Sequence, residues 1–291
     1  MADAPKKLTI AAIAAKVARG EPFFQVTAVD YPTALLIDRA GIDLILVGDS
    51  LGMTALGYGG TVPVTMDEMI HHAKAVSRAV ERAIVVGDLP FGAYHASAED
   101  AIRNAIRMQK EGGTDVVKME GGEAFAGTAR AIVEAGVPVM GHIGLTPQTA
   151  TKLGGFKVQG KDVAGSLQLI RDAEALEAAG CFAIVLEAIP DRIAGLITER
   201  LAIPTSGIGA GPHCSGQTLV LHDLIGMFDR FLPRFAKRYC NVAEEIGRAL
   251  DDFQAEVRGG AFPAPENCFT IKDPDLDAVR AALDAPDKAA E

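Results

Sequence analysis

Short runs of apolar residues, many of them β-branched, recur along the chain and alternate with stretches in which charged and apolar residues mix. The runs lack the strict polar and apolar alternation of a strand with one solvated face, so they are typical of strands buried on both faces. The eight strands that they predict lie at residues 24–30, 43–49, 83–89, 115–121, 137–143, 182–188, 203–209 and 219–225.

The stretches between these runs are rich in Ala, Glu, Arg and Leu, which favour helix. Glycines such as Gly41 and Gly180 follow shortly afterwards and mark helix ends before the next strand. Strands and helices that alternate in this way predict an α/β fold, a (β/α)8 TIM barrel, and not an open doubly wound sheet. The predicted helices include residues 66–81, 98–111, 124–135, 165–179 and 192–201.

The two ends of the chain predict smaller additions to the barrel. Near the N-terminus, Lys16 and Arg19 interrupt an apolar stretch, which favours a short amphipathic helix over a secretory signal. Residues 243–257 predict a final helix, and the sequence after Gly259 breaks it. We therefore expect a single catalytic domain over residues 1–265 and a C-terminal tail over residues 266–291.

Net charge and cysteine spacing argue against several classes of protein. A formal net charge of −10 and a pI near 5.1 provide no basic surface for nucleic acid or an anionic membrane. The four cysteines have no paired spacing typical of a zinc site or a disulfide framework. We expect a cytoplasmic enzyme that acts on small molecules.

Three of the predicted strands end on a carboxylate, namely Asp49, Asp88 and Glu120. Any one of these residues could simply cap the following helix. In a parallel barrel, however, the carboxyl ends of all strands meet at one mouth, so the three acids can share one cation. Hard oxygen donors of this kind favour Mg²⁺, which keeps positions open for water or substrate oxygens.

Three further residues are expected at the same mouth. Lys118 shares a strand face with Glu120, where it could form a structural ion pair or hold an anionic substrate. Glu187 ends the sixth strand among apolar residues, which suits a base that removes a proton. His142 ends the fifth strand. It could be a structural residue, a metal ligand or a residue that forms a hydrogen bond with the substrate.

Several distinctive phrases occur in a fixed order along the chain. They are Val47-Gly48-Asp49-Ser50-Leu51-Gly52-Met53, Asp88-Leu89-Pro90-Phe91, Val117-Lys118-Met119-Glu120-Gly121-Gly122, Gly141-His142-Ile143-Gly144-Leu145-Thr146-Pro147-Gln148, Lys157-Val158-Gln159-Gly160, Gly207-Ile208-Gly209-Ala210-Gly211 and Phe235-Ala236-Lys237-Arg238-Tyr239. With these phrases the chain closely resembles the ketopantoate hydroxymethyltransferase family of the phosphoenolpyruvate mutase and isocitrate lyase superfamily. The resemblance spans nearly the whole chain.

The resemblance implies a role for each residue at the mouth. It implies a Mg²⁺ site formed by Asp49, Asp88 and Glu120, in which Glu120 binds directly or through water. It implies that the 2-oxo acid contacts Asp49, Ser50, Asp88 and Lys118.

The reaction that the resemblance implies is transfer of a one-carbon unit from 5,10-methylenetetrahydrofolate to 3-methyl-2-oxobutanoate, which gives 2-dehydropantoate on the route to pantothenate and coenzyme A. Glu187 would accept the C3 proton. The family also leads us to expect a homo-oligomer, a decamer. The alternatives are a Mg²⁺-dependent oxo-acid lyase or mutase of the same superfamily, whose usual Lys-Lys-Cys-Gly-His type loop is not found in this sequence, and a non-enzymatic barrel.

Overall fold

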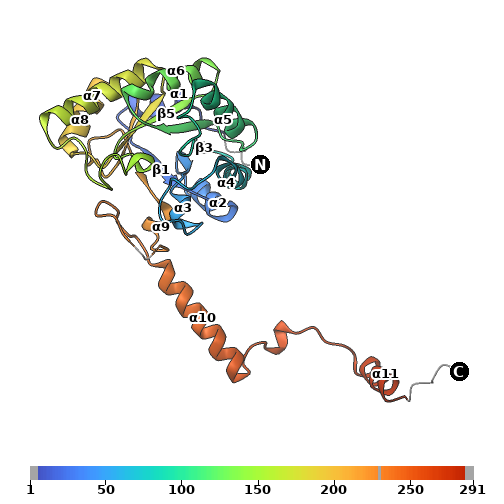
Figure 1. The fold of residues 1–291 in the computed structure, drawn as a ribbon. Coiled ribbons are helices and arrows are strands. Elements are labelled where there is room, and N and C mark those ends of the chain that lie inside the picture. Colours follow the sequence, from blue (N-terminus) through green and yellow to red (C-terminus); the bar gives the residue numbers. More distant parts are fainter. Residues whose placement is uncertain (1–5, 229–230, 286–291) are drawn as a thin grey trace. The chain divides into compact units, whose positions relative to one another are not determined.

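The computed structural model describes residues 6–228 and 231–285. The chain forms two compact units, Met1–Cys240 and Asn241–Glu291. In the first unit, parallel strands close into a barrel in which each strand pairs with the next and β8 pairs with β1 (Figure 1). This confirms the predicted (β/α)8 barrel. The strands are β1 Phe23–Thr27, β2 Leu44–Val47, β3 Ile84–Asp88, β4 Val116–Glu120, β5 Val139–Gly144, β6 Ala183–Glu187, β7 Thr205–Ile208 and β8 Gly216–Leu219.

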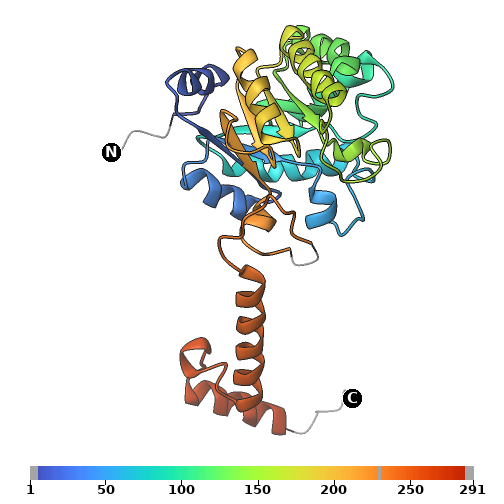
Figure 2. The same ribbon diagram turned by 90° about the vertical axis from the view of Figure 1, so that its left-hand side faces the viewer.

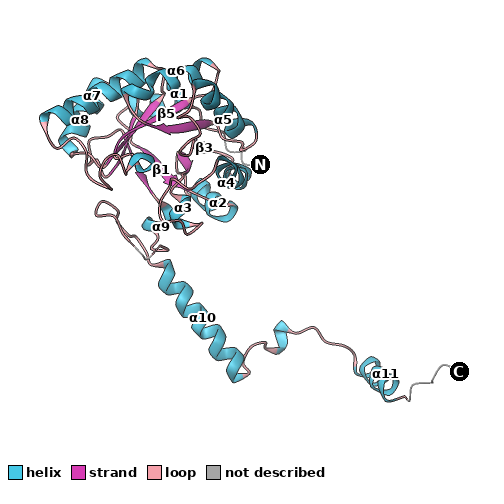
Figure 3. Cartoon of the chain, in the orientation of Figure 1, coloured by secondary structure: helices cyan, strands magenta, loops and turns pink. Residues whose placement is uncertain are grey.

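Helices surround these strands, as Figure 2 and Figure 3 show from two directions. No helix in residues 6–228 or 231–285 is long and apolar enough to cross a lipid bilayer. The helices of the first unit are α1 Ile10–Ala18, α2 Tyr31–Arg39, α3 Leu51–Thr54, α4 Met66–Ala79, α5 Ala98–Lys110, α6 Ala126–Glu134, α7 Val163–Ala178, α8 Asp191–Arg200 and α9 Leu221–Leu224, with short 3-10 turns η1 Glu123–Phe125 and η2 Pro147–Thr149.

Side-chain caps explain where several of the outer helices begin. Asp30 accepts a hydrogen bond from the amide of Thr33 and starts α2. Thr65 and Glu68 form a reciprocal capping box at the start of α4. Such caps satisfy amide groups that a helix leaves without partners in its first turn. They fix the points at which the chain turns from the barrel mouth back into the outer layer.

The barrel interior is filled by alternate residues of each strand, because successive side chains in a strand point to opposite faces. Ile13 of α1 packs into the same inner cluster and belongs to the short N-terminal helix that the sequence predicts. Strand residues on the opposite face, such as Ile45 and Val85, point away from the interior and pack against the outer helices. The inner cluster includes Phe23, Leu44, Leu46, Ile84, Val86, Val116, Met140, Ala183, Val185 and Ile208.

The last predicted strand is wrong in position. The eighth strand is Gly216–Leu219, whereas most of the segment expected to be a strand, residues 219–225, forms the short helix α9. Strand β8 has an exposed Gln217 between buried neighbours, so it lacks the continuous apolar run that marks the other strands. The apolar residues that follow β8 were mistaken for a strand. They are apolar because they pack against the core from helix α9.

The second unit contains α10 Val242–Gly259, the turn η3 Pro265–Asn267 and α11 Asp273–Asp284. The predicted final helix corresponds to α10, and the expected boundary at residue 265 falls inside this unit. Helix α11 forms within the expected tail and has no buried residue. Helix α10 also buries no side chain, although Ile246, Leu250 and Phe253 have the spacing of one helical face.

Candidate active site

The inward-facing residues change from apolar to charged at the carboxyl ends of the strands. Val86 is followed two positions later by Asp88, and Val116 is followed at the same spacing by Lys118 and then Glu120. Strand pairing places Asp88 beside Lys118 across β3 and β4. These charges therefore gather at the mouth because they continue the alternation that fills the barrel.

Lys118 contacts one of the acids that the sequence singles out. Its Nζ atom is 2.8 Å from Asp88 Oδ1, and both side chains are almost fully buried. The other Asp88 oxygen, Oδ2, accepts a hydrogen bond of 3.0 Å from the Asp49 amide. Burial lowers the pKa of Lys118, but the nearby charges of Asp88, Glu120 and Asp49 outweigh it and hold the pKa above its ordinary value. Lys118 is therefore a fixed positive charge within the cluster.

A glutamine connects the other two acids. Gln148, in η2, is 4% exposed and donates from Nε2 to Asp49 Oδ2 at 2.8 Å. Its backbone amide donates to Glu120 Oε2 at 3.0 Å. Tyr94 donates from its hydroxyl to Gln148 Oε1 at 2.7 Å and accepts from the Glu120 amide at 3.1 Å. This network orients the carboxylates of Asp49 and Glu120.

The cluster holds more negative than positive charge. Burial, followed by the charge of Asp88, raises the pKa of Asp49 to about 7. Burial and the charge of Asp49 likewise raise the pKa of Glu120 well above its usual range. Lys118 opposes both shifts without cancelling them. The buried acids therefore require a further cation to be fully ionised together near neutral pH.

These donors suit a magnesium ion that binds only one or two of the carboxylates directly. In the part of the chain that the structure describes, no group of three or more His, Cys, Asp and Glu side chains could hold a metal ion. Mg²⁺ usually binds one or two carboxylates and keeps several water molecules or substrate oxygens. Asp88 Oδ1 has no hydrogen bond despite its burial and its contact with Lys118, so it is one oxygen that could bind such an ion. The donor set thus suits an ion completed by water and substrate.

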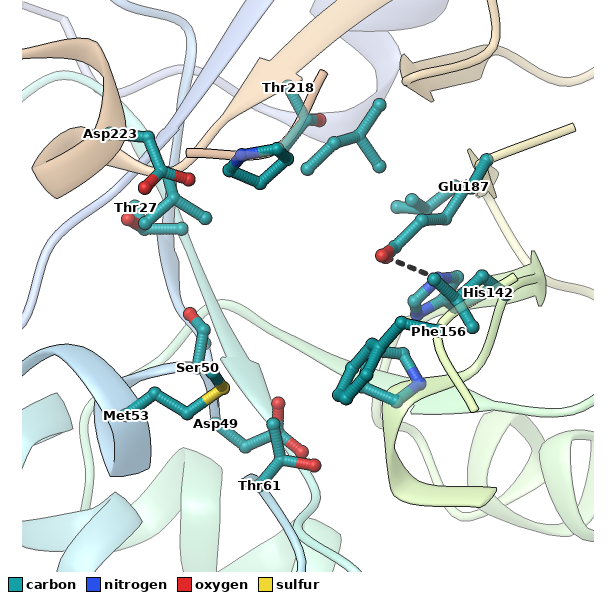
Figure 4. A pocket seen from close by; sticks show the side chains of 18 of the residues that line it. Thr27, Asp49, Ser50, Met53, Thr61, His142, Phe156, Glu187, Thr218 and Asp223 are labelled. Atoms are coloured by element: carbon teal, nitrogen blue, oxygen red, sulfur yellow. Dashed lines mark ion pairs between the residues drawn. The ribbon is translucent and has the colours of Figure 1, made fainter. Parts of the chain in front are cut away.

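His142 and Glu187 meet on the adjacent strands β5 and β6. His142 Nε2 is 3.1 Å from Glu187 Oε2, a contact drawn as a dashed line in Figure 4. Burial, followed by the charge of Lys118, lowers the pKa of His142, so its ring is neutral at pH 7. On the other side of the ring, Nδ1 lies 3.3 Å from Lys118 Nζ and 3.5 Å from Glu120 Oε1. His142 therefore packs between the acid cluster and the Glu187 carboxylate.

These side chains line a cavity of about 620 Å³. Ser50 lies at its wall beside Asp49, and Glu187 reaches it from the other side (Figure 4). Apolar and aromatic residues form much of the remaining wall, including Phe156 and Phe235. Charged side chains thus share one cavity with apolar and aromatic residues.

The structure brings together all seven residues that the sequence places at the mouth, since each lines this cavity. Sequence reasoning missed Gln148 and Tyr94, and it did not single out Asp223, which also lines the cavity. Gln148 stood in a recognised phrase, but only its contacts with residues far away in sequence reveal what it does. Asp223 was hidden because its segment was assigned to a strand.

Comparisons with known proteins identify the family. The sequence profile described as ketopantoate hydroxymethyltransferase matches residues 7–265. A 3-methyl-2-oxobutanoate hydroxymethyltransferase of Moorella thermoacetica is 58% identical over 263 residues, which cover 90% of this chain and 98% of that protein. The enzyme of the same name from Heliobacterium modesticaldum is 55% identical and covers 92% of this chain and 97% of that protein.

Solved structures agree with the fold. A phosphonopyruvate hydrolase in complex with oxalate and Mg²⁺ has a TM-score of 0.59 and 16% identity, and covers 95% of this chain and 98% of that chain. A 2,3-dimethylmalate lyase of the phosphoenolpyruvate mutase and isocitrate lyase superfamily has a TM-score of 0.54 and 13% identity, covering 95% of this chain and 98% of that one. These structures support the barrel fold, and the sequence matches confirm the resemblance: the chain belongs to the ketopantoate hydroxymethyltransferase family.

Proposed function

We propose that the chain is a 3-methyl-2-oxobutanoate hydroxymethyltransferase that uses 5,10-methylenetetrahydrofolate as its one-carbon donor and gives 2-dehydropantoate. The observation that carries this proposal is the buried cluster of Asp49, Asp88, Lys118 and Glu120 beside Glu187, in a chain of this family. A 2-oxo acid carries a carboxylate and a ketone oxygen side by side. Such a ligand complements a site that combines a fixed ammonium with a place for a divalent cation.

Asp49 and Asp88 would hold Mg²⁺, with Glu120 reaching it through water. When bound, the ion would withdraw electrons from the ketone of the oxo acid and make the adjacent C3–H bond easier to break. Excess negative charge among the three buried acids supports this assignment, as does the raised pKa of Asp49. The carboxylates of this cluster would be neutralised by the ion and would also fix its position.

Lys118 and Ser50 would bind the oxo acid at the charged end of the cavity. The Lys118 ammonium is already oriented by Asp88, so it presents a positive charge without a large loss of side-chain freedom. Ser50 begins α3 and makes no side-chain capping hydrogen bond, which leaves its hydroxyl available to a ligand. Together they would orient the substrate so that C3 faces the β6 side of the mouth.

Glu187 would take the proton from C3. It is the most exposed carboxylate of the group, with a side-chain exposure of 14%, and it faces the cavity (Figure 4). The next residue, Ala188, has a φ of 46°, a left-handed conformation that is uncommon outside glycine and frequent at functional sites. His142, whose Nε2 lies 3.1 Å from Glu187 Oε2, would help to keep that carboxylate directed at the substrate.

The transfer replaces the C3–H bond of the oxo acid by a bond to a one-carbon unit. The C3–H bond breaks and its proton passes to Glu187, and the resulting carbon nucleophile forms a bond to the methylene carbon of the folate. That carbon is bonded to both N5 and N10 of the folate, so both bonds break: the bond to C3 replaces one, and the hydroxyl of a water molecule replaces the other. The two nitrogens take up two protons, one from that water and one equivalent to the proton that Glu187 removed from C3, and tetrahydrofolate leaves. The protein contributes proton transfer, orientation and charge stabilisation to this sequence.

We also propose that the protein is a homo-oligomer that acts on these small molecules. Four apolar side chains on one face of α10 support self-association, since a monomer would leave them in water. They are Ile246, Leu250, Phe253 and Val257, between 44% and 55% exposed.

A product assay tests the proposed function directly. The purified protein is incubated with 3-methyl-2-oxobutanoate, 5,10-methylenetetrahydrofolate and Mg²⁺, and 2-dehydropantoate is measured by mass spectrometry. We expect product that depends on each component and is lost in Glu187→Gln. Absence of product from protein with the circular dichroism spectrum of a folded α/β chain would reject the proposal.

A further inference from the structure

Asp223 is a buried carboxylate that the proposed chemistry leaves without a role. It lies in α9, directly after β8, and is only 7% exposed. It lines the same cavity as the acid cluster and faces the opening from the side opposite Glu187 (Figure 4). Within residues 6–228 and 231–285, its side chain makes no hydrogen bond or ion pair, while the charge of Arg238 acts on it from a greater distance.

Burying a carboxylate in this position lowers the stability of the fold unless hydrogen-bond donors contact its oxygens. Burial raises the pKa of Asp223, and Arg238 only partly opposes that shift. The acid cluster lies at the ends of β2, β3 and β4, whereas Asp223 lines the cavity from α9. The Asp223 oxygens are therefore charged acceptors that stand apart from that cluster. A ligand with two parallel N–H donors would satisfy both oxygens at once.

The space beside Asp223 fits a second, larger ligand. The cavity of about 620 Å³ lies in the size range of drug-sized ligands, well beyond an oxo acid of eight non-hydrogen atoms. Phe156, Phe231 and Phe235 line it and are 61%, 65% and 38% exposed. Aromatic side chains that remain this exposed at a cavity offer flat surfaces for a planar ring.

We propose that Asp223 recognises the pterin ring of the one-carbon donor by accepting hydrogen bonds from its N3–H and 2-amino groups. The ring stacks on the aromatic side chains, with Phe156 as the principal contact. Lys157 and Arg234, exposed cations in the same lining, face the glutamate carboxylates of the folate. The inference rests on the proposed function and adds the residues that hold the second substrate.

The test separates the two substrates. In Asp223→Asn, which keeps the size of the side chain, the Kd for tetrahydrofolate measured by titration calorimetry should rise roughly 10- to 100-fold, as expected for loss of a charged hydrogen-bond acceptor. The rate of Mg²⁺-dependent C3 deuterium exchange of 3-methyl-2-oxobutanoate, which needs no folate, should stay within about twofold of the wild type. Asp67→Asn, which alters a carboxylate that is 82% exposed, is the matched control and should change neither quantity.

A folate analogue identifies the contact. Tetrahydrofolate in which a methyl group replaces the 2-amino group should bind the wild type more weakly, and Asp223→Asn should bind both folates equally. Phe156→Ala should weaken both folates in either background. Unchanged folate affinity in Asp223→Asn, or parallel loss of folate binding and C3 exchange, would overturn the assignment. Failure of exchange in the wild type would instead reject the proposed function.

Discussion

Gln148 Nε2 donates a hydrogen bond of 2.8 Å to Asp49 Oδ2, and so links two loops that are 99 residues apart in sequence. The same amide nitrogen donates to the backbone oxygen of Leu89 at 3.0 Å, directly after Asp88. Tyr94 holds the remaining amide oxygen. One glutamine thus connects the loops after β2, β3 and β5, and it fixes the direction in which Asp49 presents its other oxygen.

Replacing Gln148 should weaken metal binding without removing a metal ligand. Gln148→Met keeps the length of the side chain but removes the amide, so Asp49 and Tyr94 lose their partner. We expect Mg²⁺ affinity to fall roughly 10- to 100-fold, as for other groups that orient metal ligands. Calorimetric titration with Mg²⁺ and saturating oxo acid measures this change.

Tyr94→Phe is the control for that experiment. It removes one hydroxyl that contacts Gln148 but leaves the amide bonded to Asp49, so its loss of Mg²⁺ affinity should be smaller. Equal Mg²⁺ affinity in the wild type and in Gln148→Met would show that the glutamine does not orient the site.

Asp88 should matter to both binding and stability. Asp88→Ala removes the carboxylate that neutralises Lys118 and accepts from the Asp49 amide, which leaves a buried charge unpaired. We expect loss of Mg²⁺-dependent oxo-acid binding and a fall of about 3–5 kcal/mol in the free energy of unfolding. Denaturant titration followed by circular dichroism measures the second effect.

A companion variant separates the two roles of Asp88. Asp88→Asn still offers an oxygen to the Asp49 amide, so it should unfold at a higher denaturant concentration than Asp88→Ala, while it still binds the oxo acid poorly. Strong Mg²⁺-dependent binding in either variant would remove Asp88 from the metal site.

Glu187→Gln should separate binding from chemistry. The amide keeps the shape of the side chain but cannot accept the C3 proton, so deuterium exchange at C3 should fall roughly 10²- to 10⁴-fold. The oxo acid should still bind within a fewfold of wild type, because Lys118 and the acid cluster are intact. Proton NMR in D₂O measures the exchange. Unchanged exchange would exclude Glu187 as the base.

Magnesium should stabilise the protein more at high pH. The folded-state pKa of Asp49, about 7, exceeds its ordinary value of 3.8, so the metal-free fold binds the extra proton between these values. Its contribution to stability is therefore present at low pH and is lost as pH rises toward 7. Binding of Mg²⁺ requires the ionised carboxylate and releases that proton.

The difference in melting temperature with and without Mg²⁺ should accordingly grow from pH 5.5 to pH 8. Taking this difference at each pH removes the effect on the melting temperature of ionisable groups that Mg²⁺ does not influence. Calorimetry in two buffers with different ionisation enthalpies should also detect proton release. A shift that shrinks as pH rises would contradict the raised pKa of Asp49.

The barrel was predictable because most of its strands are continuous apolar runs, and the charges at their ends follow from that pattern. Strands β2, β3 and β4 each combine buried apolar residues with an acid at or just after the last position. Strand β8 was misplaced because polar residues such as Gln217 and Thr218 occupy it. Local hydrophobic pattern therefore finds strands that are buried on both faces and misses one that is not.

The site was only partly predictable, for a physical reason. Asp88, Lys118 and Glu120 could be placed together because strand order and side-chain alternation determine which way they face. The contacts of Gln148 depend on how a short turn after β5 folds back over two other loops. Loop geometry of that kind is set by tertiary packing, which one sequence does not reveal.

We propose that Asp49, Asp88 and Glu120 surround one divalent cation together with the oxo acid. Anomalous diffraction from crystals soaked with Mn²⁺ and 3-methyl-2-oxobutanoate tests it most directly, because Mn²⁺ accepts the same oxygen ligands as Mg²⁺ and can be located without ambiguity. We predict one strong peak bonded to the carboxylates of Asp49 and Asp88, with Glu120 linked through water and the oxo acid completing the ligands. A peak remote from these acids, or an oxo acid bound at the mouth without any metal peak beside Asp49 and Asp88, would show that these residues do not form the metal site.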